Sequence, residues 1–326
     1  MPRGLLTTAV GSYPKPEELL QARNRLAHGQ GSEEELRQLE RKAVAHWTQV
    51  QEELGMDILV DGEMYRGDMV TYFSEHMEGF AISGLVRSYG NRYYRKPIAV
   101  APVGRKSAVT VEWWQYAQSL TDRPVKGMLT GPYTMADWSF NEYYDTREVF
   151  VLDLARAVHE EALDLVRAGA KYIQIDEPAV STRPEEMELA SRALGIVTRD
   201  LEAFTITHVC YGDFAAVFDQ LVRLPVDMLD LEMANSNYDL LEMFRQQPLP
   251  EEKALSMGVV DVHNHRVETV EEIVAGIKRG LELLPPERLY INPDCGLKTR
   301  TEEEAVGKLR NMVEAVRQVR EELGIS

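Results

Sequence analysis

Short runs of apolar and β-branched residues alternate along the chain with longer segments whose apolar residues recur every three or four positions. The short runs predict eight strands, at 5–10, 56–61, 125–131, 172–176, 204–210, 226–232, 255–263 and 288–293. The longer segments predict amphipathic helices, and the clearest span 33–55, 147–169 and 267–284. Strands that alternate with helices in this way are typical of α/β proteins with a parallel sheet.

Eight units of strand followed by helix predict a (β/α)8 TIM barrel that forms a single catalytic domain over residues 1–326. An open doubly wound sheet is the alternative, but no G-x-G-x-x-G or P-loop motif follows the first predicted strand. The long connection after the second predicted strand, at 79–104, predicts a hairpin-like insertion over the barrel mouth.

Composition narrows the class of protein. Two cysteines in 326 residues cannot form a disulfide framework, which favours a reducing compartment. The formal net charge of -17 would repel nucleic acid and anionic membrane surfaces, so we expect neither as a partner. The chain opens with no signal-peptide pattern, and no apolar run approaches a membrane span. We therefore expect a cytoplasmic protein.

Residues with chemically active or ligand-like side chains gather where the predicted strands end. In a (β/α)8 barrel the carboxyl ends of the strands meet at one face, which is where barrel enzymes carry their active sites. The residues at these places are Ser12, Glu63, Trp138, Asp176, His208, Cys210, Glu232, His263 and Cys295. The sequence thus predicts one pocket lined by all of them.

A metal site is the sharpest hypothesis within this set. His208 and Cys210 are two apart on a predicted strand, so their side chains point to the same face. Glu232 at the end of the next strand and Cys295 two strands further on add a carboxylate and a second thiolate. Imidazole, thiolate and carboxylate ligands suit tetrahedral zinc. The alternative is that both cysteines are ordinary buried thiols and that His208 is a hydrogen-bonded core histidine.

Six segments together resemble the catalytic half of the cobalamin-independent methionine synthase family. They are TTAVGSYPKP, DGEMYRGDMVTYF, QIDEPA, HVCYGDF, GVVDVH and NPDCGLKTR, which run from residue 7 to residue 300 in the family's order. The resemblance implies a zinc-dependent transfer of a methyl group to the thiol of L-homocysteine, which gives L-methionine. It also implies that His208, Cys210, Glu232 and Cys295 are the zinc ligands.

The resemblance further implies how homocysteine is held. Glu63 and Asp176 match residues that bind the substrate ammonium group, and the segment Val10, Gly11 and Ser12 matches the one that binds the carboxylate. Each also has a plain structural alternative. Asp176 could cap a helix or a turn, Glu63 could be a solvated loop acid, and Ser12 could serve the turn before a proline.

His263 matches the family's proposed general acid, so His263 and Asp176 are the catalytic residues that the resemblance implies. A histidine has a pKa near neutrality and suits the protonation of a leaving nitrogen. His265 stands two residues further on and could be mistaken for it. The alternative for His263 is a histidine that is only hydrogen-bonded in the barrel mouth.

The methyl donor is the point at which the sequence departs from the family. The sequence predicts one barrel where full-length members have two, and Thr182 stands where the family carries a glutamate that contacts the folate pterin. Both features weaken the case for a folate donor. The single-barrel form resembles the short "core" methionine synthases, and this resemblance implies methylcobalamin or a methylated corrinoid protein as the donor, with 5-methyltetrahydrofolate, as its polyglutamate, as the alternative. Arg92 and Trp138 match family positions near the pterin and are the expected donor-binding residues.

Three other functions fit parts of the pattern. A related zinc methyltransferase could act on another thiol such as coenzyme M, although Glu63 and Asp176 favour an amino-acid acceptor. A hydrolase could use zinc-bound water, but two thiolate ligands make zinc a poorer Lewis acid. A binding module could hold a closed structural zinc, which would leave no exchangeable position for a substrate.

Overall fold

Six strands form the larger sheet in a computed structural model that describes residues 3–87, 93–210, 212 and 214–325. In order across the sheet they are β3 (Gly127–Thr130), β5 (Tyr172–Asp176), β6 (Phe204–Val209), β7 (Met228–Leu231), β8 (Ala254–Gly258) and β9 (Leu289–Asn292). The pairs β3–β5, β5–β6 and β8–β9 are parallel. The predicted α/β class with a parallel sheet is therefore confirmed.

Burial explains why these strands are so apolar. Every residue of β3, β7 and β8 is buried, and β5 and β6 have one partly exposed residue each at their first position. Strands of parallel sheets are covered on both faces, so their sequences are continuous apolar runs instead of alternating ones. This is the pattern from which the strands were predicted.

The first two predicted strands, 5–10 and 56–61, do not form regular strands in the described structure. Each makes one isolated bridge to another segment. Thr7 pairs with Ile291 of β9, and Leu59 pairs with Val125 just before β3. Between the two segments the Thr7 N–H donates to Asp57 Oδ2 at 2.8 Å. A carboxylate thus replaces a backbone carbonyl as the partner of Thr7, which prevents a regular ladder. The order of neighbours agrees with that expected in a (β/α)8 barrel.

The strand predicted at 255–263 is too long. β8 ends at Gly258, and His263 lies five residues beyond it in a loop. The His263 N–H donates to Asp261 Oδ1 at 2.8 Å, which makes a local turn. The apolar residues of this segment are buried in the loop instead of continuing the strand, so hydrophobicity alone overestimated its length.

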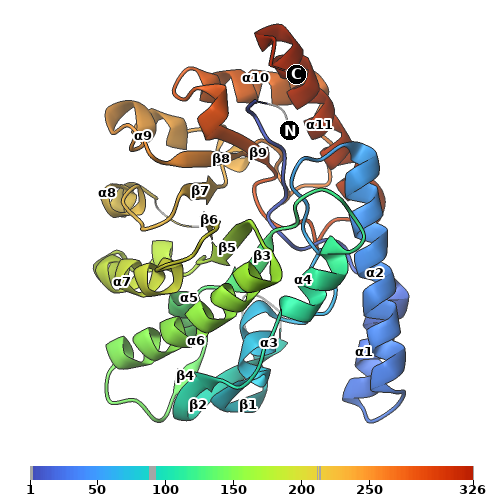
Figure 1. Ribbon diagram of the computed structural model, residues 1–326, viewed down its shortest axis with the longest axis vertical. Helices are drawn as coiled ribbons and strands as arrows, with labels where there is room; N and C mark the ends of the chain where they lie inside the picture. The colour runs from blue at the N-terminus through green and yellow to red at the C-terminus, as the bar shows by residue number, and fades with distance from the viewer. Residues whose placement is uncertain (1–2, 88–92, 211, 213, 326) are drawn as a thin grey trace. The chain divides into compact units, whose positions relative to one another are not determined.

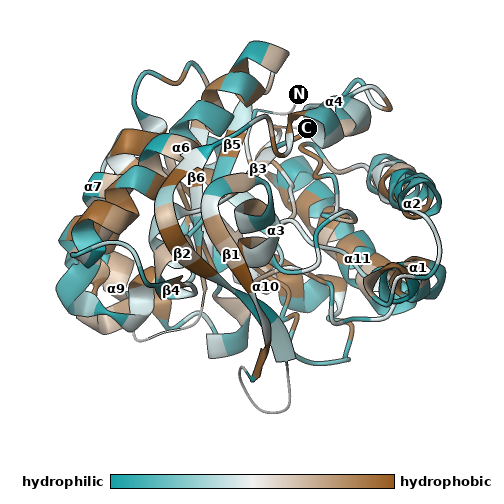
Figure 2. Ribbon diagram, turned by 90° about the horizontal axis from the view of Figure 1, so that it is seen from below, coloured by the Kyte–Doolittle hydropathy of each residue, from teal (hydrophilic) through white to brown (hydrophobic). Residues whose placement is uncertain are grey.

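A second, smaller sheet contains the predicted insertion. β1 (Met77–Arg87) and β2 (Tyr93–Arg105) pair antiparallel, and the short β4 (Phe140–Asn141) pairs with β2. The register shifts just after Glu78, where Gly79 has φ +86 and its backbone packs so closely on Pro102 that a side chain would meet the Pro102 oxygen at 2.4 Å. Figure 2 shows hydrophobic and hydrophilic residues along both long strands. The described residues thus form two antiparallel strands where the sequence predicts a hairpin.

Helices connect the strands. Their bounds are α1 (Glu17–Ala27), α2 (Glu33–Leu54), α3 (Met69–Glu75), α4 (Val111–Gln118), α5 (Pro132–Asp137), α6 (Arg147–Ala168), α7 (Met187–Thr198), α8 (Phe218–Leu221), α9 (Leu240–Gln246), α10 (Val270–Leu281) and α11 (Glu302–Leu323). The three clearest predicted helices are α2, α6 and α10, each within three residues of its predicted bounds. Thr269 and Glu272 form a capping box at the start of α10, and Gly55 and Gly169 end α2 and α6 in the left-handed conformation.

The chain divides into two units by its internal contacts. Unit 1 comprises Met1–Tyr65, Trp113–Lys126 and Asp230–Ser326, and unit 2 comprises Arg66–Glu112 and Gly127–Leu229. The long helices α10 and α11 lie side by side in unit 1 (Figure 1). None of the helices in the described part of the chain is both long and apolar enough to cross a bilayer.

A buried ion pair fastens α11 to the loop that carries His263. Lys308 of α11 is fully buried, and its ammonium contacts both oxygens of Glu268 at 3.0 and 3.1 Å. The same ammonium donates to the carbonyl of Asp261 at 2.9 Å and to that of Arg266. Burying a lysine is costly unless its charge is paired and its donors are used, and here both conditions are met.

We expect Lys308→Met to destabilise unit 1 strongly. The substitution leaves the Glu268 carboxylate buried without its cation, which typically costs about 3–5 kcal/mol. Arg317→Met on the same helix is the control, because Arg317 makes exposed ion pairs with Glu314 and Glu321. Urea unfolding should show a large loss of unfolding free energy in the first variant and a near wild-type value in the second. Equal effects of the two changes would contradict this assignment.

Candidate active site and metal ligands

His208 and Cys210, two of the predicted metal ligands, lie together in unit 2. His208 is the fifth residue of β6, and Cys210 directly follows the strand. Both side chains are buried, and their ligand atoms lie within 4.8 Å of each other. Gly212, two residues after Cys210, packs on Ser181, since a side chain at Gly212 would meet Ser181 Cβ at 2.5 Å. The alternation of side chains along a strand thus brings an imidazole and a thiol together, as the sequence predicted.

Asp176 lies at the end of β5, the strand beside β6, and its Cα is paired with that of His208. Its Oδ1 accepts a hydrogen bond from the Gln174 amide at 2.8 Å. Asp176 is 7% exposed, so it is a buried acid at the carboxyl end of β5, beside the end of β6 that carries His208.

The neighbouring acid, Glu177, has a structural role that the sequence pattern did not predict. Its carboxylate accepts the N–H groups of Tyr133 and Thr134, at 3.0 and 2.7 Å, at the start of α5. It also accepts the Thr134 hydroxyl at 2.6 Å. Burial raises the pKa of Glu177 to about 7. Glu177, not Asp176, therefore caps this helix, which argues against the capping alternative for Asp176.

Glu232 and His263 face each other in unit 1. The His263 Nε2 lies 3.7 Å from Glu232 Oε2, and this carboxylate is the main cause that raises the pKa of His263. Glu232 is buried, whereas the His263 side chain is 33% exposed and can reach solvent or a ligand. His265 is 75% exposed and binds Glu304 instead, so the two histidines are clearly separated.

Cys295 lies in the loop after β9, next to a second buried acid. Asp294 has no exposed surface, and burial raises its pKa to about 7. Its Oδ1 accepts the N–H groups of Met233 and Ala234 at 2.8 and 2.9 Å, and its Oδ2 accepts that of Asn235 at 2.8 Å. The loop that carries Cys295 is thereby tied to the loop that follows Glu232.

The segment Val10, Gly11 and Ser12 packs against the same loop. The Leu297 N–H donates to the Ser12 carbonyl at 2.7 Å. A side chain at Gly296 would meet Ser12 Oγ at 2.1 Å, so glycine is required by the close approach of the two segments. The predicted carboxylate-binding segment therefore lies beside the loop of Cys295 within unit 1.

Glu63 occupies a strained turn in unit 1. Its φ is +56, in the left-handed region that non-glycine residues seldom adopt, and its N–H donates to Asp61 Oδ1 at 2.8 Å. The Tyr13 N–H donates to the carbonyl of Gly62 at 3.2 Å, which joins this turn to the residue after Ser12. Such strain is usually held in place by surrounding contacts, so this turn is more constrained than a loop that is merely solvated.

The residues expected to bind the donor are less defined. Arg92 lies outside the described residues. Trp138 ends α5 and is partly exposed, so its ring can take part in stacking. The Thr182 hydroxyl donates to the carbonyl of Ala179 at 2.8 Å, which is a local turn interaction. The assignment of Arg92 and Trp138 to donor binding stays a prediction.

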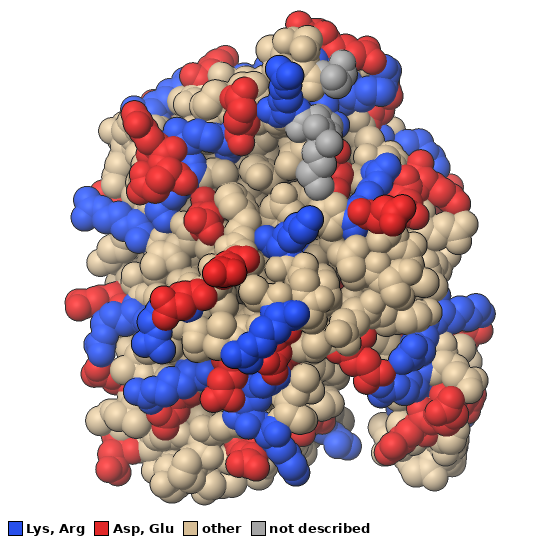
Figure 3. Space-filling view, viewed as in Figure 1, with Lys and Arg blue, Asp and Glu red and all other residues tan. Residues whose placement is uncertain are grey.

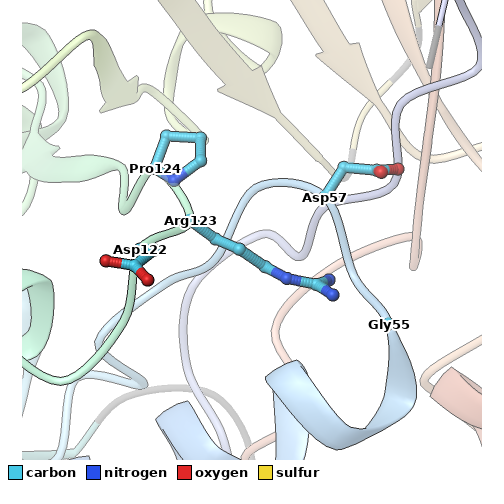
Figure 4. Close-up of a pocket in the computed structure, with 5 residues that line it drawn as sticks. All are labelled: Gly55, Asp57, Asp122, Arg123 and Pro124. Carbon is cyan, nitrogen blue, oxygen red and sulfur yellow. The ribbon is translucent and has the colours of Figure 1, made fainter. Parts of the chain in front are cut away.

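A surface pocket in unit 1 involves none of the predicted site residues. It is lined by Gly55, Asp57, Asp122, Arg123 and Pro124. Figure 4 shows the Arg123 side chain extending between Asp57 and Gly55 while the Asp57 carboxylate points away from it. The pocket residues lie at or before the starts of the strand segments 56–61 and 125–131, whereas the predicted site residues lie near or after the ends of the strands. Active sites of parallel α/β folds form at the latter ends.

Charge on the visible surface does not indicate a nucleic-acid interface. Figure 3 shows acidic and basic side chains interspersed over the face in view. Exposed charges also pair with one another, for example Arg25 with Glu35 and Lys278 with Glu322. Such exposed pairs contribute little to stability.

Comparison with known proteins identifies the family. A family described as "Cobalamin-independent synthase, Catalytic domain" matches residues 5–318. A methionine synthase of Saccharolobus solfataricus is 41% identical over 98% of this chain and 96% of that protein. A methionine synthase of Sulfurisphaera tokodaii is 39% identical over 98% of this chain and 94% of that protein.

A solved structure agrees with these sequence relatives. It is a B12-independent methionine synthase from Shewanella sp. W3-18-1 in complex with selenomethionine, with a TM-score of 0.86 and 29% identity over 98% of this chain and 99% of that chain. The predicted resemblance is thus confirmed, and so is the expectation of an enzyme. The chain belongs to the cobalamin-independent methionine synthase family, as a member that matches its catalytic domain.

Proposed function

We propose that this protein is a zinc-dependent methyltransferase that transfers a methyl group to the thiol of L-homocysteine and forms L-methionine. Membership of the family supports the reaction. The buried His208 and Cys210 pair, with ligand atoms within 4.8 Å, is the observation that carries the metal assignment. Glu232 and Cys295, which both follow strands in unit 1, complete the proposed ligand set.

The donor chemistry of these four residues fits zinc. One imidazole, two thiolates and one carboxylate match the ligands of tetrahedral zinc sites. Because these four ligands would fill a tetrahedral site, the homocysteine thiol would have to displace one of them or bind as a fifth ligand. When bound, zinc stabilises the thiolate form of a coordinated thiol and thereby makes homocysteine a nucleophile at neutral pH. His263 stays outside the ligand set in this proposal, so its Nε2 remains able to hold or move a proton.

The substrate's amino-acid end is assigned to three elements. Asp176 and Glu63 accept hydrogen bonds from the ammonium group, and the segment from Val10 to Ser12 receives the carboxylate. Buried or fixed carboxylates bind an ammonium group strongly because such hydrogen bonds are charge-assisted. The Shewanella relative was solved with selenomethionine, the selenium analogue of the product, which supports an amino-acid site in this family. The same argument favours homocysteine over coenzyme M, which has no ammonium group.

We propose 5-methyltetrahydrofolate, as its polyglutamate, as the methyl donor. The corrinoid donor and corrinoid-protein partner expected from the sequence find no support in the comparisons, because the family is described as cobalamin-independent. A folate donor needs a proton on its leaving nitrogen, and His263 is the candidate to supply it from Nε2. Trp138 is the candidate for stacking on the pterin ring.

The first test concerns the metal. Purified protein should contain about one zinc per chain, and Cys210→Ser and Cys295→Ser should each lower both the zinc content and the activity, because each removes a thiolate ligand. Metal analysis of the purified variants measures this directly. Full zinc occupancy in both variants would reject the ligand set.

The second test concerns Asp176. Asp176→Asn should weaken homocysteine binding by roughly tenfold to a hundredfold, since it removes a charged hydrogen-bond acceptor. Zinc content should stay at the wild-type level, because no ligand is lost. Asp164→Asn is the control, because the Asp164 carboxylate pairs with Arg105 and Arg167, which are not among the proposed site residues. A wild-type KM for homocysteine in Asp176→Asn would exclude the proposed role.

The third test concerns the donor and the acid. The wild-type protein should turn over with methyltetrahydrofolate, and His263→Ala should slow that reaction on the order of 100-fold or more because the leaving nitrogen is no longer protonated. His265→Ala is the control, since His265 is exposed and binds Glu304. Steady-state assays with methyltetrahydrofolate and methylcobalamin, offered separately, decide the point. Turnover with methylcobalamin alone, unaffected by His263→Ala, would restore the corrinoid donor.

A further inference from the structure

We infer that Asp294 is a positioning residue that holds Glu232 and Cys295 in a fixed arrangement for the metal. The inference rests on the proposed function, since it takes these two residues as zinc ligands. It assigns no bond to the metal for Asp294 itself. The Asp294 oxygens are already used by backbone donors of unit 1.

The Asp294 carboxylate occupies an anion-binding site formed by backbone N–H groups. The consecutive residues Met233, Ala234 and Asn235 all direct their N–H groups at the Asp294 carboxylate, at 2.8, 2.9 and 2.8 Å. Successive N–H groups that converge in this way form a concave site for an anion. Hydrogen bonds to a charged acceptor are stronger than those between neutral groups. The carboxylate therefore fixes the backbone of all three residues.

Close packing fixes Asp294 itself. A side chain at Gly258, the last residue of β8, would meet Asp294 Oδ1 at 2.2 Å and its Cα at 2.8 Å. The Asp294 N–H donates to the carbonyl of Val260 at 2.9 Å. The carboxylate thus has one position available, between the end of β8 and the loop after β7.

The loop after β7 has an unfavourable backbone conformation that contacts with other segments must stabilise. Asn237 and Tyr238 have φ values of 53 and 66, so two successive non-glycine residues are in the left-handed region. Such residues are unfavourable, and the conformation persists only when surrounding contacts determine it. Tyr238 packs on α10, where a side chain at Gly276 would meet its hydroxyl oxygen at 2.1 Å. Asp294 at one end and α10 at the other hold the loop in this shape.

The position of the contact in the sequence links it to the metal. Glu232 directly precedes Met233, the first donor, and Cys295 directly follows Asp294, the acceptor. One hydrogen-bonded group therefore sets the backbone next to both proposed ligands. Contacts that orient ligands in this way typically change metal affinity by about 10-fold to 100-fold when they are removed.

Asp294→Asn tests the inference with zinc itself as the probe. The amide keeps the size of the side chain but replaces one acceptor oxygen by a donor, which cannot receive the N–H of the loop. Competition with a chromophoric chelator should show zinc affinity about 10-fold to 100-fold below that of the wild type. Gly258→Ala is the second variant, because it displaces the carboxylate without changing its chemistry. It should lower zinc affinity in the same direction.

Asp57→Asn is the matched control. Asp57 is a carboxylate of the same unit that accepts the N–H and hydroxyl of Thr7, both at 2.8 Å, and an Arg320 guanidinium, away from the proposed ligands. It should lower stability, measured by urea unfolding, and leave zinc affinity at the wild-type value.

The outcomes separate the inference from the proposed function. Wild-type zinc affinity in both Asp294→Asn and Gly258→Ala, with zinc lost in Cys295→Ser, would overturn the positioning role and leave the zinc site standing. Equal losses of zinc affinity in Asp294→Asn and Asp57→Asn would also overturn it, because the effect would then follow stability alone. A wild-type protein that binds no zinc would overturn the proposed function, and the inference with it.

Discussion

Buried carboxylates that accept backbone N–H groups hold the loops at the carboxyl ends of the strands, and the candidate site depends on them. Glu177 holds the start of α5, and Asp294 holds the loop after β7. Each is adjacent in sequence to a proposed site residue, Asp176 in one case and Cys295 in the other. Burial of a carboxylate is costly, and it is tolerated only when several donors compensate it. The two acids are therefore part of the scaffold of the site, although they contact no substrate in our proposal.

Most of the fold follows from periodicity, and the exceptions have local causes. Helices α2, α6 and α10 and strands β5 and β6 lie close to where apolar spacing predicts them. The strands predicted at 5–10 and 56–61 fail as regular strands because Leu5 has φ 52 and because Asp57 supplies a partner for the Thr7 N–H. Neither effect is visible in a hydrophobic pattern, since both arise from particular side chains and contacts 50 residues apart.

The candidate metal ligands could be predicted from the sequence, but the buried acids that hold the loops around them could not. His208 and Cys210 follow from the alternation of side chains along a strand, which needs only their spacing. Glu177 and Asp294 could not be found this way, because their partners lie 43 and 60 residues away in sequence. The available signal was weak: each is an acid at the end of an apolar strand, beside a residue already chosen for chemistry. An acid in that place is as compatible with solvent exposure as with burial until the partner loop is known.

Backbone strain points to the same part of the molecule as the buried acids. Among the described residues, the non-glycine residues with positive φ are Leu5, Glu63, Asp200, Asn237 and Tyr238. Glu63, Asn237 and Tyr238 lie in loops that follow strand segments, near proposed substrate or metal ligands. Strain of this kind is unfavourable and is retained where function requires a fixed geometry. In the reaction that we propose, the substrate thiol would have to meet a methyl group along a defined line, and misplacement by even an ångström slows such reactions greatly. The cost of these turns is therefore consistent with a site that is arranged before substrate arrives.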